Sequence, residues 1–138
     1  FFIIVLIIRY VLRNGVIFPY KNLKLRRWYC PGLYMSDDCL LKIVENLREI
    51  SKRSVGSVLK YPVMQANTPG KIRKELSNKI ILEVFKNGEL IAFHMAYISK
   101  FPHVHLGLIM VDSQHRGQGI QKLSSLSILA LSLDWFTT

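Results

Sequence analysis

The sequence predicts an α/β domain with a mostly antiparallel sheet and flanking helices, and three observations support this class. Two segments rich in β-branched and aromatic residues, 79–86 and 89–98, are joined by Asn87-Gly88, the strongest short hairpin signal. A third apolar segment, 104–111, runs into a turn with two glycines and then into a helical pattern at 123–133. Capped helical segments precede the hairpin. The 138 residues, half of them hydrophobic, can build one small core.

The elements before the hairpin can be placed in chain order. Residues 23–28 form a candidate first strand. Residues 36–53 carry apolar residues near helical spacing, and either member of the pair Ser36-Asp37 can cap the start of that helix. Thr68-Pro69 supplies an N-cap and a first-turn proline for a shorter helix that ends at Leu76. We therefore expect one strand and two helices ahead of the hairpin.

The segment 111–120, Val-Asp-Ser-Gln-His-Arg-Gly-Gln-Gly-Ile, carries the clearest functional signal. Glycine lets the backbone turn tightly and approach a ligand closely. The first N–H groups of a helix have no partner inside the helix and favour an anion. A phosphate or pyrophosphate is the anion that such a turn most often binds, so the turn predicts a nucleotide-like ligand. The sequence lacks a Walker pattern, and the dinucleotide fingerprint fails because Lys122 stands where its third glycine belongs.

The spacing Gln114-x-x-Gly117-x-Gly119 after a strand resembles the coenzyme A pyrophosphate loop of the GNAT acetyltransferase superfamily. Residues 116–120 are similar to that family's common Arg-Gly-x-Gly-Ile motif. Hairpin, strand, glycine turn and helix also follow one another in the family's order. The resemblance covers about residues 22–138 and implies a mixed, mostly antiparallel sheet flanked by helices. It departs from the family at Gln121, where many members have another glycine, and at the end of the chain, where the family adds a strand, a helix and a hairpin.

The resemblance implies how coenzyme A would be held. Backbone groups at the end of the third apolar segment would pair with the pantetheine arm. Backbone N–H groups of the glycine turn would hold the pyrophosphate, and Arg116 would add positive charge near it. The implied co-substrate is acetyl-CoA or another acyl-CoA, with no metal. The predicted cofactor-binding residues are Ile109, Met110, Val111, Gln114, His115, Arg116, Gly117, Gln118, Gly119 and Ile120.

The implied activity is N-acyl transfer, in which an acetyl group passes directly from acetyl-CoA to a small-molecule or protein amine. This reaction needs a base that takes a proton from the acceptor ammonium. The segment 104–111 has no carboxylate, so the candidate catalytic residues are His103, His105 and Glu83, with His94 as a further candidate. Imidazole titrates near neutrality, and structural hydrogen bonding is the competing role for each histidine. His103 and His105 have no third ligand nearby in the sequence, so they do not predict a metal site.

The amino-terminal segment 1–21 is hydrophobic and then basic, and we expect it to lie outside the domain at 22–138. Eight consecutive apolar residues precede Arg9, whereas a spanning helix needs about 20. Six of the ten excess positive charges precede the first acid, Asp37. An apolar run followed by Lys and Arg is the arrangement that keeps the next domain cytoplasmic. Segment 1–21 is therefore a candidate truncated membrane anchor or interfacial segment, and the competing interpretation is that residues 1–8 form a buried strand.

The sequence therefore predicts a cytoplasmic acyl-CoA-dependent N-acyltransferase, and the start at Phe1 together with the early end leads us to expect an incomplete gene product. The alternative is a non-catalytic, membrane-associated module of the same fold that senses a ligand or binds a partner. The basic cluster could instead bind nucleic acid or acidic lipid. Nucleic acid is the poorer of these two partners, because no recognisable binding motif accompanies the charge. Cys30 and Cys39 lack metal-ligand spacing, and we expect both to be reduced, buried thiols.

Overall fold

The computed structural model describes residue 3 and residues 17–98 and 104–124. Five strands form one sheet in the order β1-β2-β3-β4-β5, and every pairing among them is antiparallel. The chain order is β1 (Ile17–Tyr20), β2 (Leu23–Tyr29), η1 (Pro31–Leu33), α2 (Asp37–Val55), α3 (Pro62–Gln65), α4 (Pro69–Leu76), β3 (Lys79–Lys86), β4 (Glu89–Ile98), β5 (Val104–Val111) and η2 (Ser113–His115). Residues 120–124 begin a further helix. The predicted α/β class with a mostly antiparallel sheet is confirmed.

The two predicted helices begin at the residues that the capping signals indicate. The Ser36 hydroxyl accepts a hydrogen bond from the Cys39 N–H at the start of α2, at 3.3 Å. The Thr68 hydroxyl accepts one from the Lys71 N–H at the start of α4, also at 3.3 Å. Each cap satisfies a backbone donor that has no partner inside its own helix. Helix α2 ends at Gly56 in the left-handed conformation, where glycine carries no side-chain penalty.

The central hairpin has the predicted bounds. Asn87 and Gly88 both adopt positive φ, at 53° and 80°, as a two-residue hairpin turn requires. Strand β2 matches the predicted segment 23–28, but β1 precedes it in the sheet and was not predicted. Strand β1 is only four residues long and contains Pro19, and both features weaken a strand signal. The sheet thus includes four residues of the segment 1–21.

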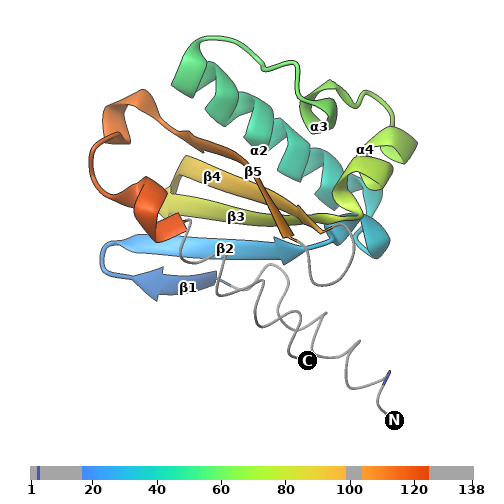
Figure 1. Ribbon diagram of the computed structural model, residues 1–138, viewed down its shortest axis with the longest axis horizontal. Helices are drawn as coiled ribbons and strands as arrows, with labels where there is room; N and C mark the ends of the chain where they lie inside the picture. Colours follow the sequence, from blue (N-terminus) through green and yellow to red (C-terminus); the bar gives the residue numbers. More distant parts are fainter. Residues whose placement is uncertain (1–2, 4–16, 99–103, 125–138) are drawn as a thin grey trace.

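Helices α2, α3 and α4 cover one face of the sheet, and the helix that starts at residue 120 lies over the other (Figure 1). Strand β3 is buried through its first six residues because it is covered on both sides. The cluster between α2 and the sheet includes Trp28, Leu40, Val44, Leu47, Ile81, Phe93, Met95 and Met110. The opposite cluster includes Leu25, Tyr29, Ile80, Leu82, Val84, Ile91 and Ile120. These two layers hold the carboxyl end of β5 between α2 and the residue 120 helix.

The structure also bears on the predictions for the two cysteines and for a membrane-spanning segment. Cys30 is buried as expected, but Cys39 is exposed, because the buried stripe of α2 runs through Leu40 and Ile43 and leaves position 39 outside. Within the described residues, no helix is long and apolar enough to cross a membrane. His103, the helical pattern beyond residue 124 and most of segment 1–21 lie outside the described residues.

His94 makes stability depend on pH. It lies on β4 opposite Leu82 and Ile109 and is 3% exposed. Burial lowers the pKa of His94 below 6.5, and the backbone of Ser124 partly offsets this. Below that pH the unfolded chain therefore binds a proton that the folded protein does not, so the free energy of unfolding should fall as the pH drops.

We expect His94→Leu to reduce the fall in the free energy of unfolding between neutral and acidic pH. For one proton this fall is at most about 1.4 kcal/mol per pH unit. Urea unfolding of both proteins at pH 5 and pH 8 measures it, and the other histidines cancel in the comparison. His94→Gln should behave like His94→Leu, since neither side chain titrates. Equal losses in the wild type and both variants would contradict the assignment.

Candidate functional site

The turn that follows β5 is organised by Asp112, which is 5% exposed. Its backbone N–H donates to the Ile91 carbonyl at 2.7 Å and so joins the end of β5 to β4. Its carboxylate accepts from the Gln114 N–H at 3.0 Å, and its carbonyl accepts from the His115 N–H at 2.8 Å. One residue therefore stops the strand and starts η2, because an aspartate side chain can satisfy backbone donors in the turn after it.

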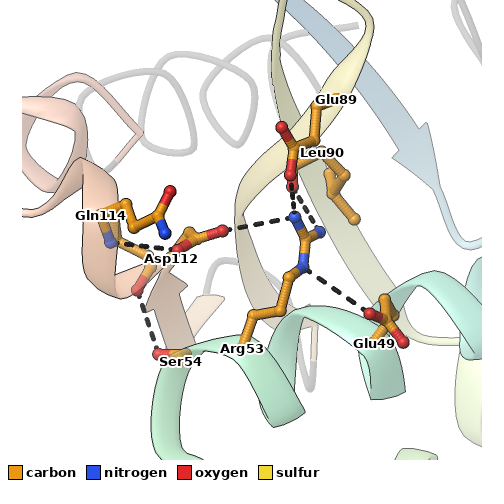
Figure 2. Close-up of polar contacts among 8 residues, drawn as sticks. Glu49, Arg53, Ser54, Glu89, Leu90, Asp112 and Gln114 are labelled. Atoms are coloured by element: carbon orange, nitrogen blue, oxygen red, sulfur yellow. Dashed lines mark hydrogen bonds and ion pairs between the residues drawn. The ribbon is translucent and has the colours of Figure 1, made fainter.

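Arg53, in the last turn of α2, ties three elements together (Figure 2). Its guanidinium lies 2.6 Å from a Glu89 carboxylate oxygen and 3.3 Å from the Asp112 carboxylate. It also donates to the Leu90 carbonyl at 2.6 Å. The planar fork of arginine suits several oxygens at once. The end of α2, the start of β4 and the turn after β5 are consequently held in one arrangement.

Ser54 and Arg116 make a second connection between α2 and the turn. The Ser54 hydroxyl donates to the Val111 carbonyl at 3.0 Å (Figure 2). The Arg116 guanidinium donates to the Ser54 carbonyl at 2.6 Å and also lies 3.1 Å from the Ser54 hydroxyl. This carbonyl is in the last turn of α2, whose final carbonyls have no partner within the helix. Arg116 is thus anchored across the turn while remaining exposed.

The two glycines of the turn adopt conformations that other residues seldom take. Gly117 has φ of 80° and Gly119 has φ of 76°, both in the left-handed region. A Cβ added at either position would meet no atom within 4 Å. The surrounding protein therefore does not require glycine here for packing. Glycine is favoured at these two positions by the positive φ alone, and the space beside both residues is open to a ligand.

A cleft of about 860 Å³ opens between the end of α2, the end of β5 and the glycine turn. We call it the main cleft. It is large enough for a sizeable part of a cofactor, since ligand sites are commonly about 300 to 1,000 Å³. No carboxylate is among its lining residues. These are Ser54, Val55, Leu59, Leu108, Ile109, Met110, Val111, His115, Arg116, Gly117, Gly119, Ile120, Gln121 and Lys122.

The structure brings most of the predicted cofactor residues to this cleft. Gln114 is not among the lining residues, and its backbone instead anchors the turn to Asp112. Gln118 lines a second cleft beside the first. The predicted residues that line the main cleft are Ile109, Met110, Val111, His115, Arg116, Gly117, Gly119 and Ile120.

Glu83, one candidate base, is fully buried on β3 beneath α2. One of its carboxylate oxygens accepts from Arg26 Nε at 2.9 Å and from the Trp28 indole N–H. The other oxygen accepts from the Asn46 amide at 3.4 Å. A carboxylate with both oxygens engaged and no exposed surface is shielded from an incoming amine. This geometry favours a structural role for Glu83.

The histidines are placed differently from one another. His105, near the start of β5, is exposed and stacks on Tyr97, with ring centroids 4.5 Å apart and planes within 8°. His94 is buried on the face opposite α2, among apolar neighbours. His105 is therefore the accessible one of the two candidates that the structure describes. The search of the described residues found no group of three or more His, Cys, Asp or Glu that could hold a metal ion.

Sequence reasoning missed the contribution of α2 to the site. Ser54 and Val55 of α2 and Leu59 of the loop after it line the main cleft, and Arg53 positions its turn. These residues lie more than fifty positions before Asp112, so no local motif connects them to it. Asp112 itself carried a signal, because an aspartate directly after a strand is a common turn former.

The fold, with its glycine turn after the fifth described strand, has the architecture of an acetyltransferase domain. A model of the Acetyltransferase (GNAT) family matches residues 44–123, and the chain belongs to this family. The family uses acetyl-CoA. No curated protein matches the chain.

Solved structures agree on the fold. An aminoglycoside acetyltransferase from an uncultured soil metagenomic sample aligns with a TM-score of 0.60 at 16% identity, covering 83% of this chain and 74% of that one. Another soil metagenomic aminoglycoside acetyltransferase, solved with sisomicin, has a TM-score of 0.60 at 14% identity, covering 83% and 72%. The PaiA N-acetyltransferase of Thermoplasma acidophilum, solved with coenzyme A, has a TM-score of 0.52 at 15% identity, covering 81% and 72%. At these identities the likeness shows the fold alone.

Removing the Arg53 side chain should destabilise the protein through the turn. In Arg53→Gln the nearly buried Asp112 carboxylate loses its cationic partner, at a cost of about 2 kcal/mol, less than for a fully buried pair because Arg53 is partly exposed. Lys52→Gln is the matched control, since it removes an exposed charge from the same turn of α2 without touching Asp112.

Chemical denaturation of both variants measures the difference. Loss of amide protection at Gln114 and His115 should accompany Arg53→Gln only. Equal, small effects from the two substitutions would show that the ion pair does not hold the turn.

Proposed function

We propose that this protein transfers an acetyl group from acetyl-CoA directly to an amine. The observation that carries the proposal is that the edge of β5 and the glycine turn line one cleft without a carboxylate. An anion entering it meets Arg116 and Lys122 and no acidic lining residue. Membership of the acetyltransferase family supports the reaction class.

The parts of the cleft suit different parts of acetyl-CoA. The backbone of Ile109, Met110 and Val111 offers a strand edge for the amide groups of the pantetheine arm. The open backbone at Gly117 and Gly119 suits the pyrophosphate, since φ above zero there exposes N–H groups without a side chain in the way. Val55 at the end of α2 and Leu59 in the loop after it add an apolar wall. In this arrangement the thioester points along β5 toward its start.

The chemistry is a single displacement at the thioester carbon. The neutral amine forms a new C–N bond, and the tetrahedral intermediate breaks the C–S bond to release the coenzyme A thiolate. The amine proton leaves to a base, and the thiolate takes up a proton. We propose His105 as the base, because it lies on β5 beyond the cleft and is exposed, whereas Glu83 is enclosed.

A non-catalytic module that binds the same ligand is the alternative. The observation that favours it is the state of Glu83, whose carboxylate oxygens are engaged by Arg26, Trp28 and Asn46. Turnover separates the two functions, since both predict binding of acetyl-CoA and only the enzyme releases coenzyme A in the presence of an amine.

Acetyl-CoA should stabilise the folded protein. At one hundred times Kd the gain is about 2.7 kcal/mol, which raises Tm by roughly 10 °C. Gly117→Glu should abolish the rise, because it places a side chain and a negative charge in the space beside the turn. Gly88→Ala is the matched control: it has the same φ of 80° and open surroundings but does not line the cleft. It should lower Tm and keep the rise. A wild type with no rise would overturn the proposal.

Release of coenzyme A should require an amine. A panel that includes sisomicin, a linear polyamine and a peptide with a free N-terminus tests the acceptor class, with thiol release as the readout. His105→Gln should lower kcat by about 100-fold or more while leaving the acetyl-CoA-induced rise in Tm intact, because general base catalysis contributes about 10² to 10⁴. Binding without turnover on any amine would favour the non-catalytic alternative.

A further inference from the structure

A second cleft, of about 340 Å³, adjoins the main cleft. It is formed by the turn between β1 and β2, the end of β3 and residues 118–123, and we call it the basic cleft. The two clefts share Gly119, Ile120 and Lys122 as lining residues. A ligand whose anionic group rests on the glycine turn can therefore extend from one cleft into the other without leaving the protein surface.

Three lysines from three separate elements line the basic cleft. Lys21 comes from the β1–β2 turn, Lys86 from the end of β3, and Lys122 from the helix that starts at residue 120. No carboxylate is among the lining residues. Within the described part of the chain none of the three makes an ion pair, although Lys79, Arg26, Arg53 and Arg73 all do. The cleft thus concentrates positive charge that no lining carboxylate offsets, and the Lys21 ammonium lies over the Tyr20 ring, 5.6 Å from its centroid.

The backbone at Lys21 is held in an unfavourable conformation. Its φ is 54°, in the left-handed region that a lysine rarely adopts. The turn around it has only two residues, because Tyr20 pairs with Leu23. A two-residue hairpin turn requires this φ, as it does at Asn87 in the β3–β4 turn. The turn thus places a lysine in one cleft with Lys86 and the glycine turn, where like charges repel one another in the absence of an anion.

We propose that the basic cleft receives the 3′-phosphate of coenzyme A. This inference rests on the proposed function, since it extends the same bound molecule beyond its pyrophosphate. A phosphate monoester carries about −1.5 to −2 charge at neutral pH and three acceptor oxygens. Three lysines that line one cleft beside the proposed pyrophosphate position match that chemistry. Lys21, Lys86 and Lys122 thereby determine specificity for coenzyme A over the molecule that lacks only this phosphate.

The test compares coenzyme A with 3′-dephospho-coenzyme A by isothermal titration calorimetry. The wild type should bind coenzyme A at least about tenfold more tightly, a difference that shrinks as salt is raised. In the double variant Lys21→Gln/Lys86→Gln the affinity for coenzyme A should fall to that for the dephospho form, which should itself stay unchanged. Lys42→Gln, an exposed lysine on α2 away from both clefts, is the control and should change neither affinity.

The outcomes separate this inference from the function on which it rests. Equal wild-type affinity for the two molecules would overturn the phosphate assignment and leave the proposed function standing. A double variant that weakens both molecules to the same extent would also overturn it, since the lysines would then act only through general charge. Failure of both molecules to bind the wild type would overturn the proposed function and this inference together.

Discussion

The arrangement of the site depends on the ion pairs of Arg53. A strand end and a helix end that are far apart in the sequence must meet at a fixed place, and hydrophobic layers alone do not set the direction of the turn that follows. Arg53 supplies that direction, because its guanidinium contacts oxygens from β4 and from the turn after β5 at the same time. With Asp112 held in this way, η2 starts at a defined point and the two glycines face the main cleft.

The same contacts shape the electrostatics of this end of the sheet. Glu89 and Asp112 both form ion pairs with the single guanidinium of Arg53, and Glu83 pairs with Arg26 on the α2 side. These acids are therefore engaged in structural ion pairs and do not line either cleft, whereas Lys21, Lys86, Lys122 and Arg116 do. The overall charge of +10 becomes a local field for anions only because the fold distributes it in this way.

Much of the fold could be predicted because its signals are local. Ser36 and Thr68 cap their helices, Asn87-Gly88 forms the central hairpin, and the run before the glycine turn is a strand. The signals failed where they were short or ambiguous: β1 has four residues and a proline, and α3 is a single turn. The burial of Cys39 was mispredicted because the direction of a helical face depends on where the sheet lies.

The sequence by itself determined the order of the elements other than β1 and α3, and the glycine turn, because caps and hairpin residues act over a few neighbouring positions. Only the tertiary structure decided which side chains surround that turn. Ser54 and Arg53 reach it across more than fifty residues, and Lys21 and Lys86 line the adjoining cleft through strand pairing. It also enclosed Glu83 and left His105 exposed. The surroundings of the turn and the burial of Glu83 follow from the packing of α2 and the residue 120 helix on opposite faces of the sheet. No local sequence pattern encodes that packing.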